Sequence, residues 1–273
     1  MSDYFVNTIG RTLWGGVLLI GVPVALAWML QRISERISGI GAYRSPLGFR
    51  AYWYFVAIGI ACHETGHAVG TWITGNRVTQ FVPFALGRED IPRLGLLGWM
   101  RHTTGGIFGV KISETIISTG PIWFGSILIL LLTRFLVGHV MNISFHDYFA
   151  DGELPGIFAY LVACLRCAML LCCELVGGSL FSGWKIFLWA YLVFCIASEM
   201  RMSNGDLKDS RDGLVRIIGV VLILLFLPFI GKWIAIGVAI LLPKLFIVHV
   251  LMLLAVLINT GFLFLERLLV RII

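Results

Sequence analysis

The residues that could do chemistry lie together in the segment His63-Glu64-Thr65-Gly66-His67. The two histidines are four positions apart, so a helix places both side chains on one face. This H-E-x-x-H pattern is typical of zinc sites in which the histidines are ligands and the glutamate is the general base. Catalytic zinc commonly takes three protein ligands and a water that it activates as a nucleophile. The segment therefore predicts hydrolysis of a peptide bond, with Glu64 accepting the proton of the attacking water.

The surroundings of this segment strengthen the prediction. H-E-x-x-H arises by chance on soluble helices, but here it lies in a long apolar run over residues 51–75. An ionisable side chain in the middle of a membrane helix costs about 2.5 to 3.5 kcal/mol on insertion scales. Three such groups in one short segment need a compensating partner, which a metal ion supplies. A proton relay and a structural polar cluster are the alternatives.

The composition predicts which elements must hold this site. The chain has 273 residues, of which 59% are hydrophobic and 13% are charged, whereas soluble domains are roughly half apolar and a quarter charged. A membrane-spanning helix needs about 20 apolar residues. We therefore expect an all-α polytopic protein of the lipid bilayer, in the cell (inner) membrane, with six to eight transmembrane helices. The formal net charge is +6; anionic lipid headgroups explain the scattered basic residues, so no nucleic-acid partner is expected.

The apolar runs divide one transmembrane domain, residues 1–273, into three parts. Residues 12–50 are expected to form an N-terminal span and a basic connector, residues 51–212 the catalytic core, and residues 213–273 the C-terminal spans. Within the core, residues 76–111 consist of short apolar pieces bounded by Gly and Pro. This pattern predicts a small membrane-associated β-strand or re-entrant segment, which is tolerated at membrane depth only inside protein or beside a wet cavity.

Two of the later runs leave alternatives open. Residues 157–200 are interrupted by glycines near 177–183, which predicts either two spans or one span preceded by a re-entrant helix. The run over residues 233–265 contains Pro243, which predicts one long kinked helix or two shorter ones.

Three features resemble the site-2 protease family of intramembrane zinc metalloproteases. They are the segment His63-Glu64-Thr65-Gly66-His67, the element Ser118-Thr119-Gly120-Pro121, and the place of residues 76–111 after the histidine helix. The resemblance covers residues 51–137. It implies a zinc-dependent endopeptidase with membrane-embedded strands that lie near the cleft and pair with an extended substrate.

The resemblance also implies a third zinc ligand, an aspartate within a Leu-Asp-Gly motif that this chain lacks. The segment Ser203-Asn204-Gly205-Asp206-Leu207 is the nearest match, and it makes Asp206 the expected ligand. An anionic ligand would lower the charge of the dication, and Gly205 is expected to permit the turn that aims Asp206 inward. The competing interpretation pairs Asp206 with Arg201 or Lys208 in a solvated loop. Three other carboxylates are alternative ligands: Glu174, Glu199 and Asp209.

Other candidates have simpler explanations. Four cysteines lie inside an apolar run, where small residues favour close helix packing over metal binding: Cys164, Cys167, Cys172 and Cys173. Arg166 and Glu174 are expected to pair with each other or within the bundle. His102 is the isolated histidine nearest the expected cleft.

Taken together, the residues and the resemblance predict a metalloprotease. Its cofactor would be Zn²⁺, held by His63, His67 and Asp206, and its substrates would be peptides or membrane proteins cut within or beside their membrane segments. The sequence does not identify a further membrane-protein partner. The alternative is a non-enzymatic transporter or assembly subunit that keeps a protease-like core. Transporters usually contain repeated halves, and the His-Glu-His segment has no second copy.

Overall fold

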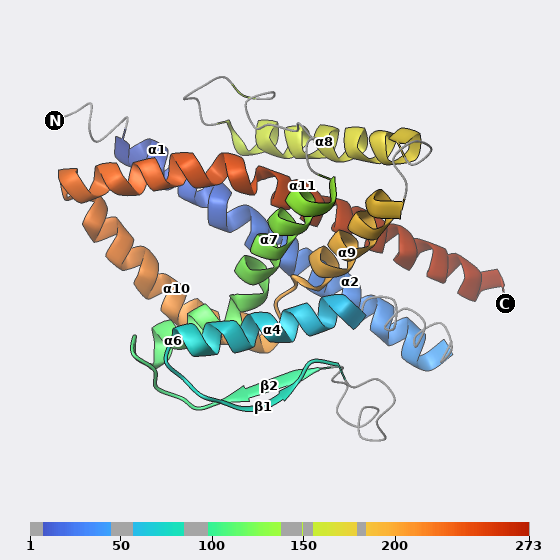
Figure 1. Ribbon diagram of the computed structural model, residues 1–273, viewed down its shortest axis with the longest axis horizontal. Coiled ribbons are helices and arrows are strands. Elements are labelled where there is room, and N and C mark those ends of the chain that lie inside the picture. Colours follow the sequence, from blue (N-terminus) through green and yellow to red (C-terminus); the bar gives the residue numbers. More distant parts are fainter. Residues whose placement is uncertain are drawn as a thin grey trace.

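A computed structural model describes residues 8–44, 57–84, 98–137, 149, 155–178 and 184–272 of the chain. Within these residues the protein is mostly helical, with one small two-stranded sheet (Figure 1).

The N-terminal segment is helical over its whole described length. It comprises α1 (Gly10–Gly16), the π-helical turn η2 (Val17–Gly21) and α2 (Val22–Arg44). The helix therefore runs through most of residues 12–50, where the sequence had predicted a span followed by a basic connector. That connector is helical as far as Arg44.

The middle of the chain contains the histidine helix and the sheet. Helix α4 (Ala57–Ile73) leads into strands β1 (Val78–Val82) and β2 (Trp99–His102), which are followed by α6 (Val110–Ser118), α7 (Gly120–Leu132) and the π turn η3 (Thr133–Val137). The remaining helices are α8 (Ile157–Gly178), α9 (Trp184–Glu199), α10 (Asn204–Leu225) and α11 (Pro228–Ile272).

Two of the described helical segments are long and apolar enough to cross a membrane, namely Gly10–Arg36 and Phe229–Gly261. Helices α6 and α7 would form a third span if they are taken together, although they are bent by 43° at their junction. The structure supports membrane helices, and the predicted count of six to eight is not confirmed by the residues that it describes. The described parts of α4 and α9 have 17 and 16 residues, less than the ~20 that a spanning helix needs, and neither is counted among these segments.

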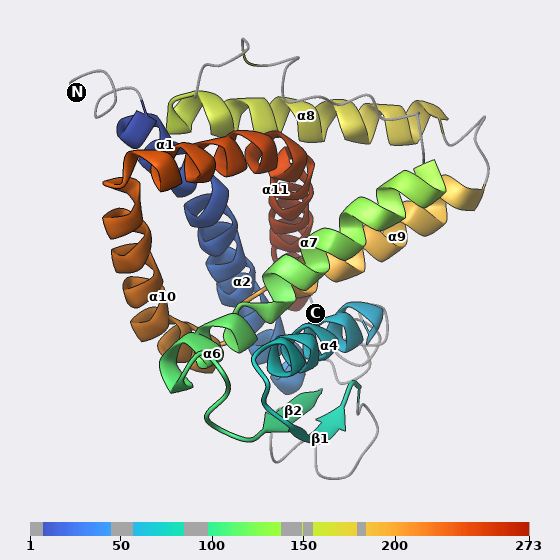
Figure 2. The same cartoon turned by 60° about the vertical axis from the view of Figure 1, so that its left-hand side comes forward.

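The run over residues 157–200 forms two helices that run in different directions. Helix α9 packs against α4 and α7, whereas α8 packs against α11 and lies across the ends of α7 and α9 (Figure 2). Two antiparallel spans would have carried Asp206 away from the sheet. The observed arrangement instead returns the chain to α4 after α9.

The sequence had predicted that the C-terminal spans begin at residue 213, but no helix begins there. The polar segment before them forms the first turns of α10, which starts at Asn204 and continues to Leu225. Helix α11 is one helix with Pro243 inside it, and it is visibly bent in Figure 2. Proline is the usual cause of such a bend, so the single kinked helix is the alternative that the structure favours.

The hydrophobic core lies between the N-terminal helix, α8, α9 and α11. Its largest fully buried side chains include Trp189, Tyr160, Phe246 and Leu18. The cysteines Cys164 and Cys167 of α8 belong to this core, as packing rather than metal binding predicts.

Helix α4 crosses the junction of α6 and α7 at very close range. A Cβ atom added to Gly66 would lie 2.8 Å from the backbone carbon of Gly120 and from Cα of Pro121. Only two glycines allow the backbones to approach this closely. The element Ser118-Thr119-Gly120-Pro121 therefore has a physical role here, which is to seat the helix that carries His67.

The sheet is an antiparallel hairpin in which Phe81 pairs with Met100 and Val82 with Trp99. It packs against α4 and lies beside that helix in Figure 1. The expectation of short strands within residues 76–111 is confirmed; residues 85–97, between the strands, lie outside the described part of the chain.

Candidate metal centre

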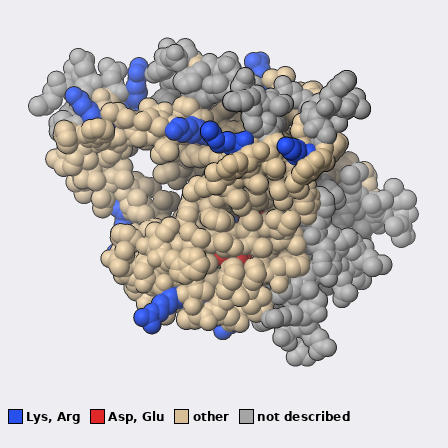
Figure 3. Space-filling view, in the orientation of Figure 1, with Lys and Arg blue, Asp and Glu red and all other residues tan. Residues whose placement is uncertain are grey.

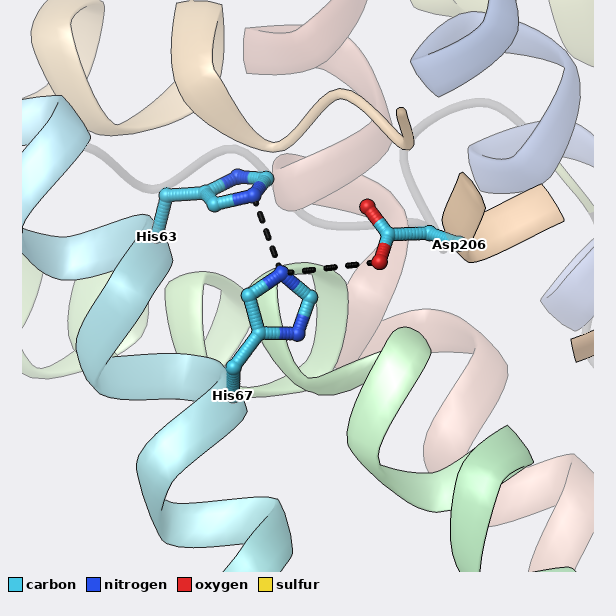
Figure 4. A group of neighbouring side chains, drawn as sticks. All are labelled: His63, His67 and Asp206. Carbon is cyan, nitrogen blue, oxygen red and sulfur yellow. Dashed lines mark hydrogen bonds and ion pairs between the residues drawn. The ribbon is translucent and has the colours of Figure 1, made fainter. Parts of the chain in front are cut away.

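The side chains of His63, His67 and Asp206 converge on one point (Figure 4). Their potential ligand atoms all lie within 4.8 Å of one another. The histidines come from the middle of α4 and the aspartate from the first turn of α10. Two histidines and one carboxylate are donors that suit zinc.

Both histidine rings are oriented by backbone carbonyl groups. Nδ1 of His63 lies 2.7 Å from the carbonyl oxygen of Glu199, and Nδ1 of His67 lies 2.8 Å from that of Ile117. A carbonyl oxygen can only accept a hydrogen bond, so each Nδ1 is the protonated nitrogen. Metal-binding histidines typically donate their second ring N–H in this way, which fixes the tautomer.

The remaining ring nitrogens face each other. Nε2 of His63 and Nε2 of His67 are 3.1 Å apart. In the neutral tautomer set by the carbonyls, neither Nε2 carries a proton, so two lone pairs would meet at this distance. A cation held by both nitrogens satisfies them, and no neutral hydrogen bond between the two rings does.

Asp206 is aimed at this point by a capping box at the start of α10. Its Oδ2 accepts a hydrogen bond from the backbone N–H of Ser203 at 2.9 Å, and its own N–H donates to Oγ of Ser203 at 3.1 Å. The other carboxylate oxygen, Oδ1, is left 3.7 Å from Nε2 of His67. The reciprocal Ser-x-x-Asp arrangement satisfies N-terminal donors of the helix and holds the carboxylate in place.

The expected role of Gly205 is wrong. Its φ is not positive, and an added Cβ would lie 3.5 Å from Oγ of Ser203, an ordinary contact. The turn therefore accepts other residues, because the capping box rather than backbone freedom directs Asp206.

The alternative carboxylates lie elsewhere. Glu199 is buried and its carboxylate accepts a hydrogen bond from Nε of Arg201 at 2.9 Å, so Arg201 pairs with Glu199 rather than with Asp206. Asp209 is exposed on α10. The side chain of Glu174 lies outside the described part of the chain, so its predicted pairing with Arg166 stays a prediction; Arg166 itself is exposed.

Glu64 is buried beside the first histidine and faces the hairpin. Only 9% of it is exposed, and a Cβ atom added to Gly98, immediately before β2, would lie 2.9 Å from its Cγ. The carbonyl oxygens of Val82 and Pro83 would lie 3.1 and 2.9 Å from the same added Cβ atom. The end of the hairpin thus packs directly on the expected general base.

His102 does not join the metal centre. Its Nδ1 donates to the carbonyl oxygen of Thr103 at 2.8 Å, and its Nε2 lies 3.7 Å from a carboxylate oxygen of Glu114. The residue links β2 to α6. In Figure 3, acidic atoms appear near the middle of the face among uncharged residues, whereas basic side chains lie across its upper part and at its lower left.

Reasoning from the sequence missed the residues that support the three ligands. The carbonyls of Ile117 and Glu199 give no signal, because every residue type has one. Ser203 did leave a signal, since Ser-x-x-Asp before an apolar run is a helix-start pattern.

Comparison of the chain with protein-family models, with curated proteins and with solved structures finds no match. The geometry of the site and the residues that form it are therefore the basis for proposing a function.

Proposed function

We propose that the chain is a zinc metalloprotease of the membrane that hydrolyses peptide bonds within or beside membrane segments of its substrates. The observation that carries the proposal is the pair of Nε2 atoms of His63 and His67, 3.1 Å apart, with both Nδ1 atoms committed to carbonyls. Asp206 adds the anionic donor beside them. The resemblance to the site-2 protease family supports the same conclusion.

Each residue of the site would have a distinct role in such a reaction. His63, His67 and Asp206 would hold the ion, and zinc when bound would act as a Lewis acid toward water and the scissile carbonyl. Glu64 would accept the proton of the attacking water and return it to the leaving amine. A purely structural zinc site would have no use for this buried carboxyl group.

The hairpin is the proposed binding surface for the substrate backbone. Among the described residues the sheet has two strands, so each strand has an edge with unpaired backbone groups, and Thr79, Gln80 and Phe81 of β1 are exposed. An extended peptide can add to such an edge by main-chain hydrogen bonds. Because the hairpin ends against Glu64, a peptide bound along it would lead to the general base.

The membrane placement is part of the proposal. We infer a multi-pass protein of the cell (inner) membrane, since two described helices are long enough to span and a bent pair could add a third. The substrate would be a membrane protein or a peptide held near the bilayer, and a further membrane-protein partner is compatible with this placement. A nucleic-acid partner is not proposed.

Metal content and cleavage measured on the same preparations test the proposal. The detergent-purified protein should contain zinc in stoichiometric amount, and the double variant His63→Ala, His67→Ala should contain almost none. His102→Ala is the matched control, because this histidine lies outside the metal group. Cleavage of a peptide library, read by mass spectrometry, should follow the zinc content. Stoichiometric zinc without any hydrolysis would favour the non-enzymatic transporter or assembly subunit instead.

A further inference from the structure

The C-terminal end of α9 is a buried polar cluster where four helices meet. Ser198 and Glu199 are 4% and 3% exposed, and Arg201 follows directly after the helix. This cluster lies between α4, which carries the histidines, and the two long helices α2 and α11. Its three polar residues each bond to a different neighbour.

One of these bonds leads to the metal centre. The carbonyl oxygen of Glu199 accepts the hydrogen bond from Nδ1 of His63 at 2.7 Å. One turn before His63, a Cβ atom added to Gly59 would lie 2.9 Å from Cγ of Glu199, so the stem of this glutamate packs tightly on α4. The position of Glu199 therefore sets the orientation of the His63 ring.

Two further hydrogen bonds tie the cluster to α2 and α11, which lie outside the predicted catalytic core. Within the cluster, Nε of Arg201 donates to the carboxylate of Glu199 at 2.9 Å. Nη1 of the same Arg201 donates to Oγ of Ser34 on α2. On the other side, Nδ2 of Asn259 on α11 donates to Oγ of Ser198 at 3.0 Å. Ser34 and Asn259 are both buried.

We propose that Glu199 and Arg201 are positioning residues for the zinc ligand His63, and that α2 takes part in the metal site through Ser34. The proposal rests on the proposed function, because it assumes that His63 binds a metal. A buried ion pair contributes little net stability, since desolvation of the charges offsets their attraction. A buried pair whose hydrogen bonds are all satisfied can instead hold its residues in one position. Here the pair would hold the backbone carbonyl of Glu199 where it accepts the hydrogen bond from His63.

The physical consequence is a dependence of metal affinity on residues that touch no metal. Without Arg201, the carboxylate of Glu199 would be buried without its cation, so the end of α9 would shift to reach water. The carbonyl that orients His63 would move with it. Loss of a group that orients a metal ligand typically weakens metal binding about 10-fold to 100-fold.

The test measures the zinc dissociation constant of the purified, folded protein by competition with a chelator. Arg201→Met should weaken zinc binding about 10-fold or more, and Ser34→Ala, which leaves the ion pair in place, should weaken it less. Arg32→Met is the matched control for Arg201→Met: Arg32 also pairs with a glutamate, Glu35, but it lies on α2 and its side chain is 54% exposed. Ser126→Ala is the control for Ser34→Ala, because Ser126 is buried and bonds only within its own helix.

Cobalt substitution separates a positioning role from a merely structural one. The visible spectrum of Co²⁺ in the site reports the ligand geometry, so Arg201→Met should change it, whereas a variant that is only less stable keeps the wild-type spectrum in its folded fraction. Wild-type zinc affinity in both Arg201→Met and Ser34→Ala would overturn the proposal. If Arg201→Met does not fold, Ser34→Ala alone decides, and wild-type affinity in that variant overturns it. A wild type that binds no metal would overturn the proposed function as well.

Discussion

Nε2 of His63 and Nε2 of His67 lie 3.1 Å apart, although carbonyl oxygens hold the proton of each ring on Nδ1. Two unprotonated nitrogens at this distance repel each other, and a shared cation removes the repulsion. This relationship ties the H-E-x-x-H pattern to a defined chemistry, because it requires both the helical spacing and the two carbonyls that set the tautomer.

The first prediction concerns the third ligand. Asp206→Ala should lose most of the bound zinc and all hydrolysis, because it removes the anionic donor 3.7 Å from His67 Nε2. It should also remove the Asp206 half of the capping box at the start of α10 and so destabilise the first turn of that helix. Asp209→Ala, on the exposed side of the same helix, is the matched control. Zinc content by elemental analysis decides, and full zinc in Asp206→Ala would transfer the ligand role to another carboxylate.

The second prediction concerns the crossing of α4 over the α6–α7 junction. Gly66→Ala should lower the thermal unfolding temperature, since its Cβ would lie 2.8 Å from backbone atoms of Gly120 and Pro121. Overpacking of this kind costs about 1 to 3 kcal/mol. Gly16→Ala should not lower the temperature, because no atom lies within 4 Å of its added Cβ. Equal unfolding temperatures for the two variants would contradict the close approach.

The third prediction concerns the contact between the hairpin and the general base. Gly98→Ala should keep its zinc but lose kcat about tenfold or more, because the added Cβ displaces Glu64 and a misplaced catalytic group is costly. Arg101, three residues later in β2, is exposed, so Arg101→Ala should behave as wild type. A normal kcat in Gly98→Ala would mean that Glu64 does not depend on the hairpin.

The fourth prediction concerns strand addition. Phe81→Pro removes a backbone N–H from β1 and should slow cleavage, while Phe81→Ala, which keeps that N–H, should slow it less. Substrates with Gly or Pro near the scissile bond should be cut faster than their helical counterparts, because they unwind more readily. Cleavage rates indifferent to both changes would rule out binding in extended form.

The sequence made part of this site predictable. His63, Glu64 and His67 are local in sequence, so helical spacing alone predicts their shared role. Asp206 required the resemblance, because no spacing rule links α10 to α4 across the intervening helices. The orienting carbonyls of Ile117 and Glu199 were not predictable, since backbone groups are common to all residues and only the fold brings them to the rings.

The types of secondary structure could be predicted from the sequence, but the number of membrane-spanning helices could not. Composition predicted apolar helices, and the Gly- and Pro-bounded pieces predicted the hairpin. The count of six to eight spans is not confirmed by the described helices. Apolar composition also does not reveal the direction of a helix. Helix α8 illustrates this: it is apolar, yet it lies across its neighbours (Figure 2).

Zinc content and peptide cleavage in wild type and Glu64→Gln, measured on the same preparations, decide whether Glu64 is the general base of a zinc-dependent hydrolysis. Gln keeps the shape of the side chain but cannot accept the proton of the attacking water. The account predicts equal, stoichiometric zinc in both proteins, cleavage by the wild type and none by Glu64→Gln. Cleavage by Glu64→Gln at the wild-type rate, or a wild type without zinc, would contradict it.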